Sequence, residues 1–268
     1  MKLSEAIQIL KNAGVESPTH DAKEIFSRIG DIPKSLLISK DISTDSKAVI
    51  SAIERRKKRE PLQYIIGDVG FYRETYKVSP DCLIPRQDTE ILVDYAVKNI
   101  PSGAHFLDLC TGSGCVAIST LKNTQATTAT ATDISKGALK IAEENAKLNG
   151  VSDRLHLLLA NALDTPLEIS PFAILSNPPY VTASAYRKLE KEIYFEPEIA
   201  FVGGEDGLVF YRKILKHYID KIDKNGFFAF EIGFDQGNAL SSLSESFGLK
   251  CEILKDLSGL DRVAVLRL

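Results

Sequence analysis

A short segment of glycine and small polar residues follows an apolar run near the middle of the chain. The run covers residues 105–109. Directly after it come Cys110, Thr111, Gly112, Ser113 and Gly114. Glycine has no Cβ, so the backbone of such a loop can approach a ligand closely. A helix that begins where the loop ends adds N–H groups that point at the same ligand. The segment therefore predicts a small-molecule site at the end of a strand.

An acidic residue follows the next predicted strand. Asp133 comes after residues 128–132, at a distance from the loop that suits a carboxylate binding ribose hydroxyls. A nicotinamide dinucleotide is one possible ligand, but its fingerprint has a third small position after two glycines, and here that position is Ala117. Asp108 precedes the loop and resembles the acidic residue in the corresponding motif of S-adenosylmethionine (SAM) methyltransferases. The sequence therefore favours SAM as the cofactor, with S-adenosyl-L-homocysteine as its product.

A rigid turn follows a third predicted strand, at the same edge of the sheet. Residues 173–176 run directly into Asn177, Pro178, Pro179 and Tyr180. Proline fixes φ and has no N–H, so the turn is stiff and presents carbonyl oxygens. We hypothesise that the Asn177 side-chain oxygen and the Pro178 carbonyl each accept one N–H of a planar amino group. Tyr180 would stack on the flat face of that group. Positioning would carry most of the catalysis, because a sulfonium is an excellent leaving group.

Segments on both sides of this turn resemble the HemK/PrmC family. Residues 83–90 read L-I-P-R-Q-D-T-E, which is similar to the I-P-R-P-D-T-E signature of that family, with Gln87 in the place of the usual proline. Residues 195–197 (F-E-P) and 203–207 (G-G-E-D-G) resemble two further family segments. Residues 231–233 (E-I-G) resemble its late strand and turn; a glutamate there either takes part in catalysis or orients a loop. The resemblance extends over essentially the whole chain.

The resemblance implies N5-methylation of the glutamine in the Gly-Gly-Gln motif of class I peptide chain release factors. It implies catalytic roles for Asn177, Pro178 and Tyr180, which with Pro179 would hold the glutamine. Phe71 would either wall the substrate site or pack in the core of a hairpin. Ala162 would line the adenine region without stacking on the base. By the family pattern, the SAM-binding residues are Cys110, Thr111, Gly112, Ser113, Gly114, Asp133, Asn161, Ala162 and Asn177.

Composition and charge exclude several classes of protein. With 44% hydrophobic and 26% charged residues, the 268-residue chain is typical of a globular protein. No apolar run approaches the ~20 residues of a membrane helix. Charges within the apolar periodicity of the first residues indicate a helix and not a signal peptide, so we expect a cytoplasmic protein with no membrane partner. The four cysteines form no C-x-x-C pair, so we expect no metal site.

Two alternatives to the protein-glutamine methyltransferase stay open at this point. A nucleic-acid methyltransferase acting on the amino group of adenine or guanine also fits residues 177–180. That activity usually needs a basic groove, whereas the net charge here is −3 and the acidic excess lies after residue 75. A SAM-binding partner without turnover is the other alternative, which the intact turn disfavours. We therefore expect a monomeric enzyme whose partner is a release factor, with no stable nucleic-acid partner.

Alternating strands and helices must position these segments. Helices are predicted between the strands, for example at 135–149 and 208–219. Such alternation predicts an α/β fold with a mostly parallel sheet covered on both faces. With the family resemblance, it implies a Rossmann-like SAM-dependent methyltransferase domain over residues 88–268. The predicted strands are 105–109, 128–132, 155–159, 173–176, 226–231, 250–254 and 263–268.

The first part of the chain has a different pattern. Residues 1–60 show helical periodicity up to Pro61, which predicts a small helical domain. The family resemblance implies that this domain takes part in substrate recognition. Residues 61–87 are rich in β-formers broken by glycines, which predicts a β-hairpin connector. The basic run at 55–59 could contact the release factor or ribosomal RNA, but a short charge run at a helix end favours its interpretation as a solvated helix end.

Overall fold

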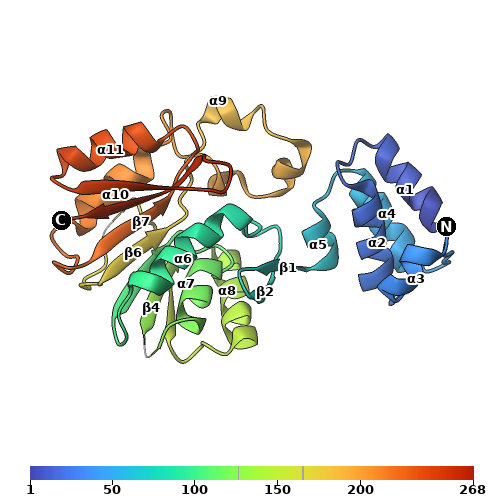
Figure 1. The fold of residues 1–268 in the computed structure, drawn as a ribbon, viewed down its shortest axis with the longest axis horizontal. Helices are drawn as coiled ribbons and strands as arrows, with labels where there is room; N and C mark the ends of the chain where they lie inside the picture. The colour runs from blue at the N-terminus through green and yellow to red at the C-terminus, as the bar shows by residue number, and fades with distance from the viewer. Residues whose placement is uncertain (126, 165) are drawn as a thin grey trace. The chain divides into compact units, whose positions relative to one another are not determined.

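The chain folds into two compact units in a computed structural model that describes residues 1–125, 127–164 and 166–268 (Figure 1). The first unit comprises Met1–Asp68 and Glu190–Phe195, and the second comprises Val69–Leu189 and Glu196–Leu268. The first unit thus extends past the predicted boundary at residue 60 and takes in a segment from the predicted methyltransferase domain. Within the described ranges, no helix is long and apolar enough to cross a lipid bilayer.

The first unit is helical. Ala22, Ile25 and Phe26 are fully buried in its apolar core. The last of its N-terminal helices covers a sequence of β-formers, because Pro61 precedes its first turn and Gly67, at φ 94°, ends it. The helices are α1 (Leu3–Asn12), α2 (Pro18–Arg28), α3 (Lys34–Ser39), α4 (Lys47–Lys57) and α5 (Leu62–Ile66), and the 3₁₀ helix η2 (Lys191–Phe195) joins them from the later segment.

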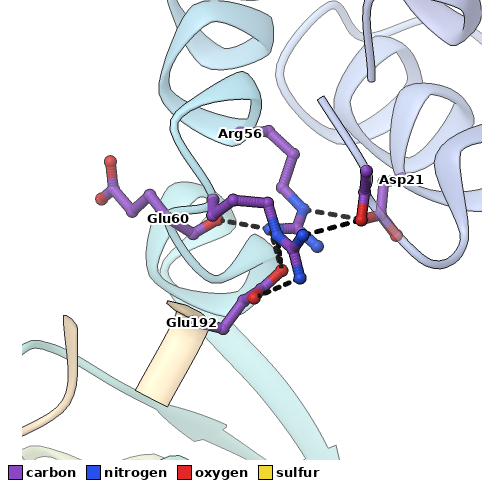
Figure 2. A network of polar contacts seen from close by, with 6 residues as sticks. Asp21, Arg56, Glu60 and Glu192 are labelled. Carbon is purple, nitrogen blue, oxygen red and sulfur yellow. Dashed lines mark hydrogen bonds and ion pairs between the residues drawn. The ribbon is translucent and has the colours of Figure 1, made fainter. Parts of the chain in front are cut away.

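Two arginines of the basic run lie within a polar network of this unit (Figure 2). Arg56 is only 7% exposed, and its Nε donates to Asp21 Oδ2 at 2.7 Å. Arg59 donates to both carboxylate oxygens of Glu192, and Arg56 Nη1 donates to one of them at 3.2 Å. The interpretation of residues 55–59 as a solvated helix end is therefore wrong for Arg56 and Arg59. Their acidic partners lie too far along the sequence for a local pattern to indicate them.

In the described part of the second unit, seven strands form one sheet in the order β5-β4-β3-β6-β7-β9-β8. The first five of these strands are parallel, and β9 is antiparallel to both β7 and β8. The predicted Rossmann-like α/β domain with a mostly parallel sheet is confirmed. The strands are β3 (His105–Leu109), β4 (Thr128–Asp133), β5 (Leu155–Leu159), β6 (Ala173–Ser176), β7 (Phe227–Glu231), β8 (Lys250–Lys255) and β9 (Asp261–Arg267).

Helices cover both faces of this sheet (Figure 1). Successive residues of a strand point to opposite faces. Accordingly, Phe106 and Phe227 pack with residues of α6, α7 and α8, whereas Leu107 and Phe228 pack with residues of α10 and α11. The helices are α6 (Glu90–Asn99), α7 (Cys115–Lys122), α8 (Lys136–Asn149), α10 (Val209–Tyr218) and α11 (Gly237–Ser246).

Short elements connect and cover this framework. Strands β1 (Asp68–Phe71) and β2 (Glu74–Lys77) form the predicted hairpin. The 3₁₀ helix η1 (Gln87–Thr89) leads directly into α6. Between β6 and α10 lie α9 (Ala183–Tyr186) and η3 (Glu198–Ala200). Of these elements, η1 and η3 supply residues to the site described next.

Candidate active site

A cavity of about 490 Å³ opens at the carboxyl ends of the central strands of the second unit. This volume is in the range of ~300–1,000 Å³ that is usual for small-molecule sites. Open parallel sheets bind their ligands at this edge. The cavity is lined by residues from the segments 81–89, 110–116, 133–138, 160–163, 177 and 197–210.

The loop after β3 forms one wall of the cavity. Cys110 and Gly112 have φ values of 62° and 54°, so the backbone turns sharply here before α7 begins at Cys115. Gly112 lines the cavity, and a Cβ at this residue would meet no atom within 4 Å, so the backbone faces open space. A Cβ at Gly114 would lie 2.8 Å from Ile118 Cδ1. Gly114 therefore serves the packing of the loop, whereas Gly112 borders the ligand space.

Asp133 joins this loop to the end of β4. Its Oδ2 accepts a hydrogen bond from the Gly112 N–H at 2.9 Å, and its Oδ1 accepts one from the Ser135 N–H at 2.9 Å. Burial raises the pKa of this carboxyl group above its usual value. Each carboxylate oxygen has a second lone pair, which suits a pair of hydroxyl donors. The residues present therefore fit the ribose of the predicted cofactor SAM.

Two buried polar atoms near the loop have no hydrogen-bond partner among the described residues. One is Ser113 Oγ, which belongs to a residue that lines the cavity. The other is Asp108 Oδ1, whose neighbour Oδ2 accepts from Thr111 Oγ1 at 2.6 Å and from the Ala117 N–H at 3.2 Å. Burial raises the pKa of Asp108 to about 7. Buried polar atoms without a hydrogen-bond partner are energetically costly. These two unpaired atoms are therefore also consistent with a polar ligand beside the loop.

Segment 160–163 lies at the same edge of the sheet, after β5. Asn161 and Ala162 line the cavity, as the family pattern implies for the adenine region. Asn161 Oδ1 accepts a hydrogen bond from the Leu163 N–H at 3.0 Å, which closes a turn around Ala162. The methyl group of Ala162 adds apolar surface without an aromatic face.

The turn after β6 brings one of the predicted substrate-binding residues to the cavity. Asn177 lines it, while Pro178 and Pro179 are buried behind it. Asn177 Nδ2 donates to Thr89 Oγ1 at 3.2 Å. Oδ1 of the same amide accepts no hydrogen bond from any residue that the structure describes. A Cβ at Gly203 would lie 2.3 Å from the Pro179 carbonyl oxygen, so only glycine permits this segment to pack directly on the turn.

Tyr180 and Phe71 are not among the described residues that line the cavity. Tyr180 is half-buried, and its hydroxyl donates to Glu231 Oε1 at 3.1 Å. Phe71 is 3% exposed and packs edge-on against Tyr76 in the core, with ring centroids 5.8 Å apart. Phe71 thus occupies a core position, which is one of the two possibilities expected for it. Stacking of Tyr180 on the substrate and contact of Phe71 with it stay predictions.

The sequence reasoning did not assign several residues that shape the site. Thr89 and Arg86 line the cavity, and both lie in the 83–90 segment that carried part of the family resemblance. Glu196 is 5% exposed, accepts from the Ile84 N–H at 2.9 Å and pairs with Arg86. The only signal for these residues was their place in segments with a family likeness, because their contacts join parts of the chain 88 to 142 residues apart.

Comparisons with known proteins cover both units of the chain. Residues 2–67 match the family described as the PrmC N-terminal domain, and residues 87–213 match the methyltransferase small domain. A solved ribosomal protein L11 methylase from Lactobacillus delbrueckii subsp. bulgaricus has a TM-score of 0.51 at 19% identity, over 71% of this chain and 83% of that one, a likeness that concerns the fold.

Curated relatives extend over nearly the whole chain. A release factor glutamine methyltransferase of Thermodesulfovibrio yellowstonii is 38% identical, over 92% of this chain and 91% of the relative. A protein of the same name from Aquifex aeolicus is 33% identical, over 91% of this chain and 89% of the relative. Similarity at this level over both units, together with the cavity that joins the glycine loop to Asn177, identifies this chain as a member of the release factor glutamine methyltransferase family.

Proposed function

We propose that this protein transfers the methyl group of SAM to the side-chain nitrogen of the glutamine in the Gly-Gly-Gln motif of class I peptide chain release factors. The observation that carries the proposal is that one cavity is lined both by the glycine loop with Asp133 and by Asn177. The cofactor half of the site and the amide-binding half thus meet in a single space. Membership of the family supports the choice of a glutamine amide.

The chain's own residues have separable tasks in this reaction. Asp133 would accept hydrogen bonds from ribose hydroxyls, and the 110–113 backbone would border the rest of the cofactor. When bound, SAM supplies a methyl group on a positively charged sulfur. Asn177 Oδ1 and the Pro178 carbonyl oxygen would each accept one N–H of the substrate amide, which orients its nitrogen for in-line attack. The nitrogen loses amide conjugation as the new N–C bond forms, so its surplus proton passes to water.

The mouth of the cavity suits a protein substrate. Ile134 and Ile199 line the cavity, and their exposed fractions are 51% and 57%. Exposed apolar side chains beside a polar site favour contact with a partner protein. We also infer that the helical first unit contributes to recognition of the release factor, and that the enzyme acts as a monomer in the cytoplasm.

Methyl transfer from radiolabelled SAM tests the proposal. The acceptors are a purified class I release factor, the same factor with its Gly-Gly-Gln glutamine changed to alanine, total tRNA and DNA. We expect label in the unchanged factor alone. Asn177→Ala should lower the rate by about 100-fold or more, as loss of one well-placed polar group does in other active sites. Asn225→Ala, at an exposed turn, is the matched control and should retain the wild-type rate.

Other outcomes would contradict particular parts of the proposal. Label in tRNA or DNA would mean that the turn at 177–180 holds the amino group of a base. Label in the factor that lacks the glutamine would place the methyl group on another residue. Binding of SAM, measured by calorimetry, without label in any acceptor would identify a binding protein without turnover.

A further inference from the structure

A buried carboxylate lies behind the turn that carries Asn177. Glu231 ends β7 and is 3% exposed. Strands β6 and β7 are parallel, with Ser176 opposite Phe230, so the residue after each of these two lies at the same level of the sheet. Thr89, at the end of η1, is 1% exposed and lines the cavity. Three distant segments of the second unit thus meet at one carboxylate.

The hydrogen bonds around this carboxylate have a defined direction. An ionised carboxylate only accepts, and a threonine hydroxyl has one hydrogen to donate. Thr89 Oγ1 donates that hydrogen to Glu231 Oε2 at 2.5 Å. Towards Asn177, Thr89 Oγ1 can then act only as an acceptor, and it receives the Nδ2 hydrogen bond at 3.2 Å. This order of donors and acceptors therefore directs the NH₂ group of Asn177 to Thr89 Oγ1 and leaves Asn177 Oδ1 for another partner.

We propose that Thr89 and Glu231 are positioning residues that fix the side-chain amide of Asn177 in the one orientation that presents its oxygen to the substrate amide. The inference rests on the proposed function, since it names the groups that prepare the same site. If the Asn177 amide were turned over, its NH₂ group would face the NH₂ group of the glutamine. Two donors would then oppose each other, and the nitrogen would not be held for attack.

The same carboxylate also holds the other end of the turn. Its second oxygen, Glu231 Oε1, accepts the hydroxyl of Tyr180 at 3.1 Å. One group therefore fixes both the first and the last residue of the 177–180 segment. Buried polar networks in which every member is paired are rigid, whereas a missing member leaves a buried group unsatisfied. This arrangement makes the conformation of the turn depend on a residue that does not line the cavity.

The charge of Glu231 is set by its surroundings. Burial raises its pKa to about 7. The two charged side chains that face it have opposite effects, since Asp88 raises the pKa and Arg262 lowers it. Arg262 also pairs with Asp88 at 3.1 Å and with Asp256 at 3.0 Å. A protonated Glu231 could donate to Thr89 Oγ1. The Thr89 hydrogen would then be free to point at Asn177, and the selection of one amide orientation would be lost.

Three variants of the full-length enzyme test the inference, with the release factor as acceptor. Thr89→Val removes the hydroxyl at nearly constant volume, and Glu231→Gln replaces the obligate acceptor with a group that can donate. We expect both to lower kcat by about 10- to 100-fold, with little change in KM for SAM. Thr89→Ser keeps the hydroxyl and should recover most of the wild-type kcat. The wild-type kcat should fall below pH 7 more steeply than that of Glu231→Gln, because Glu231 titrates in the wild type alone. Asp108 titrates in both enzymes and therefore does not cause the difference.

The outcomes separate this inference from the proposed function. If the wild-type enzyme does not label the release factor, the proposed function fails before any variant is compared. If it does, a Thr89→Val enzyme with unchanged kcat overturns the inference. A Thr89→Ser enzyme as slow as Thr89→Val overturns it too, because the hydroxyl would then not be the active feature. Thr89→Val leaves Glu231 in place, so the valine–serine comparison decides the matter even where Glu231→Gln does not fold.

Discussion

Asp108 is a buried acid whose ionisation opposes folding. Its pKa is about 7 in the folded chain because of burial, compared with 3.8 as the ordinary value. The folded state therefore holds this proton more tightly than the unfolded state does. This tighter proton binding stabilises the folded state. The stabilisation is fully present below pH ~4 and is lost as the pH rises through ~7.

We expect Asp108→Asn to gain stability over the wild type as the pH rises. The difference in free energy of unfolding should move in the variant's favour by about 2 to 3 kcal/mol between pH 5 and pH 8. Urea unfolding of both proteins at the two pH values measures it. Asp153→Asn, at an exposed turn, provides the control and should show no such trend. An equal difference at both pH values would mean that Asp108 is not protonated in the folded protein near neutral pH.

At the scale of single residues, the sequence predicted the groups that border the ligand better than those that support them. The loop at 110–113, Asp133 and Asn177 follow strand ends, and the rule for parallel sheets brings such positions together. Glu231 also lies at the end of a parallel strand, and the sequence analysis left it a role either in catalysis or in orienting a loop, but Thr89 follows no comparable rule. Their contacts appear only when three segments up to 142 residues apart are folded against each other.

One asparagine of α8 joins three elements of the second unit. Asn145 is fully buried. Its Oδ1 accepts from the Lys77 N–H at 2.7 Å, and its Nδ2 donates to the carbonyl oxygens of Lys77 and Ser113 at 3.0 and 2.9 Å. The side chain thus fastens the end of β2 to the glycine loop. Because Ser113 borders the cavity, this clamp links the hairpin to the cofactor site.

Asn145→Ala should weaken both folding and cofactor binding. Three backbone groups, of which the Ser113 carbonyl is buried, would lose a partner, so we expect a loss of roughly 2–4 kcal/mol in the free energy of unfolding. Calorimetry with SAM at a temperature where the variant is folded should show a lower affinity. Asn149→Ala is the matched control on the same helix, since Asn149 contacts the hairpin through the Thr75 carbonyl and does not touch the loop. Equal losses of affinity in the two variants would argue against the clamp.

At the scale of elements, the strands were predicted closely. The predicted strands at 105–109, 155–159 and 173–176 have the observed bounds, because each is a short, largely apolar run between turns. Helix α5 could not be predicted from its β-formers, since its end depends on the left-handed conformation of Gly67. The position of β9 between β7 and β8 could not be predicted either, because strand order depends on long-range packing.

At the scale of the whole molecule, the segment Glu190–Phe195 departs from the division that the sequence suggests. The chain enters the second unit after Asp68, returns for these residues and leaves again at Glu196. Glu192 accepts hydrogen bonds from Arg59. It also accepts one from the buried Arg56, as Figure 2 shows. The first unit is therefore built from two separate stretches of sequence.

Removal of this ion pair should destabilise the first unit. Glu192→Ala leaves the Arg56 guanidinium buried with fewer acceptors, and we expect a loss of about 1–3 kcal/mol in the free energy of unfolding. Amide hydrogen exchange in α2 and α4 should report it, and high salt should reduce the effect only slightly, since the pair is largely buried. Glu190→Ala, an exposed acid of the same segment, is the control. Unchanged exchange in both helices would show that Glu192 is dispensable there.

The two-part construction of the first unit also affects the order of events while the protein is being made. Asp68 leaves the ribosome roughly 120 residues before Glu192 does. At about 5–20 residues per second, Glu192 is synthesised about 6–25 s after the N-terminal helices. During that interval Arg56 and Arg59 are unneutralised by Glu192 in the nascent chain. Completion of the first-made unit thus depends on synthesis having passed through most of the Rossmann-like sheet.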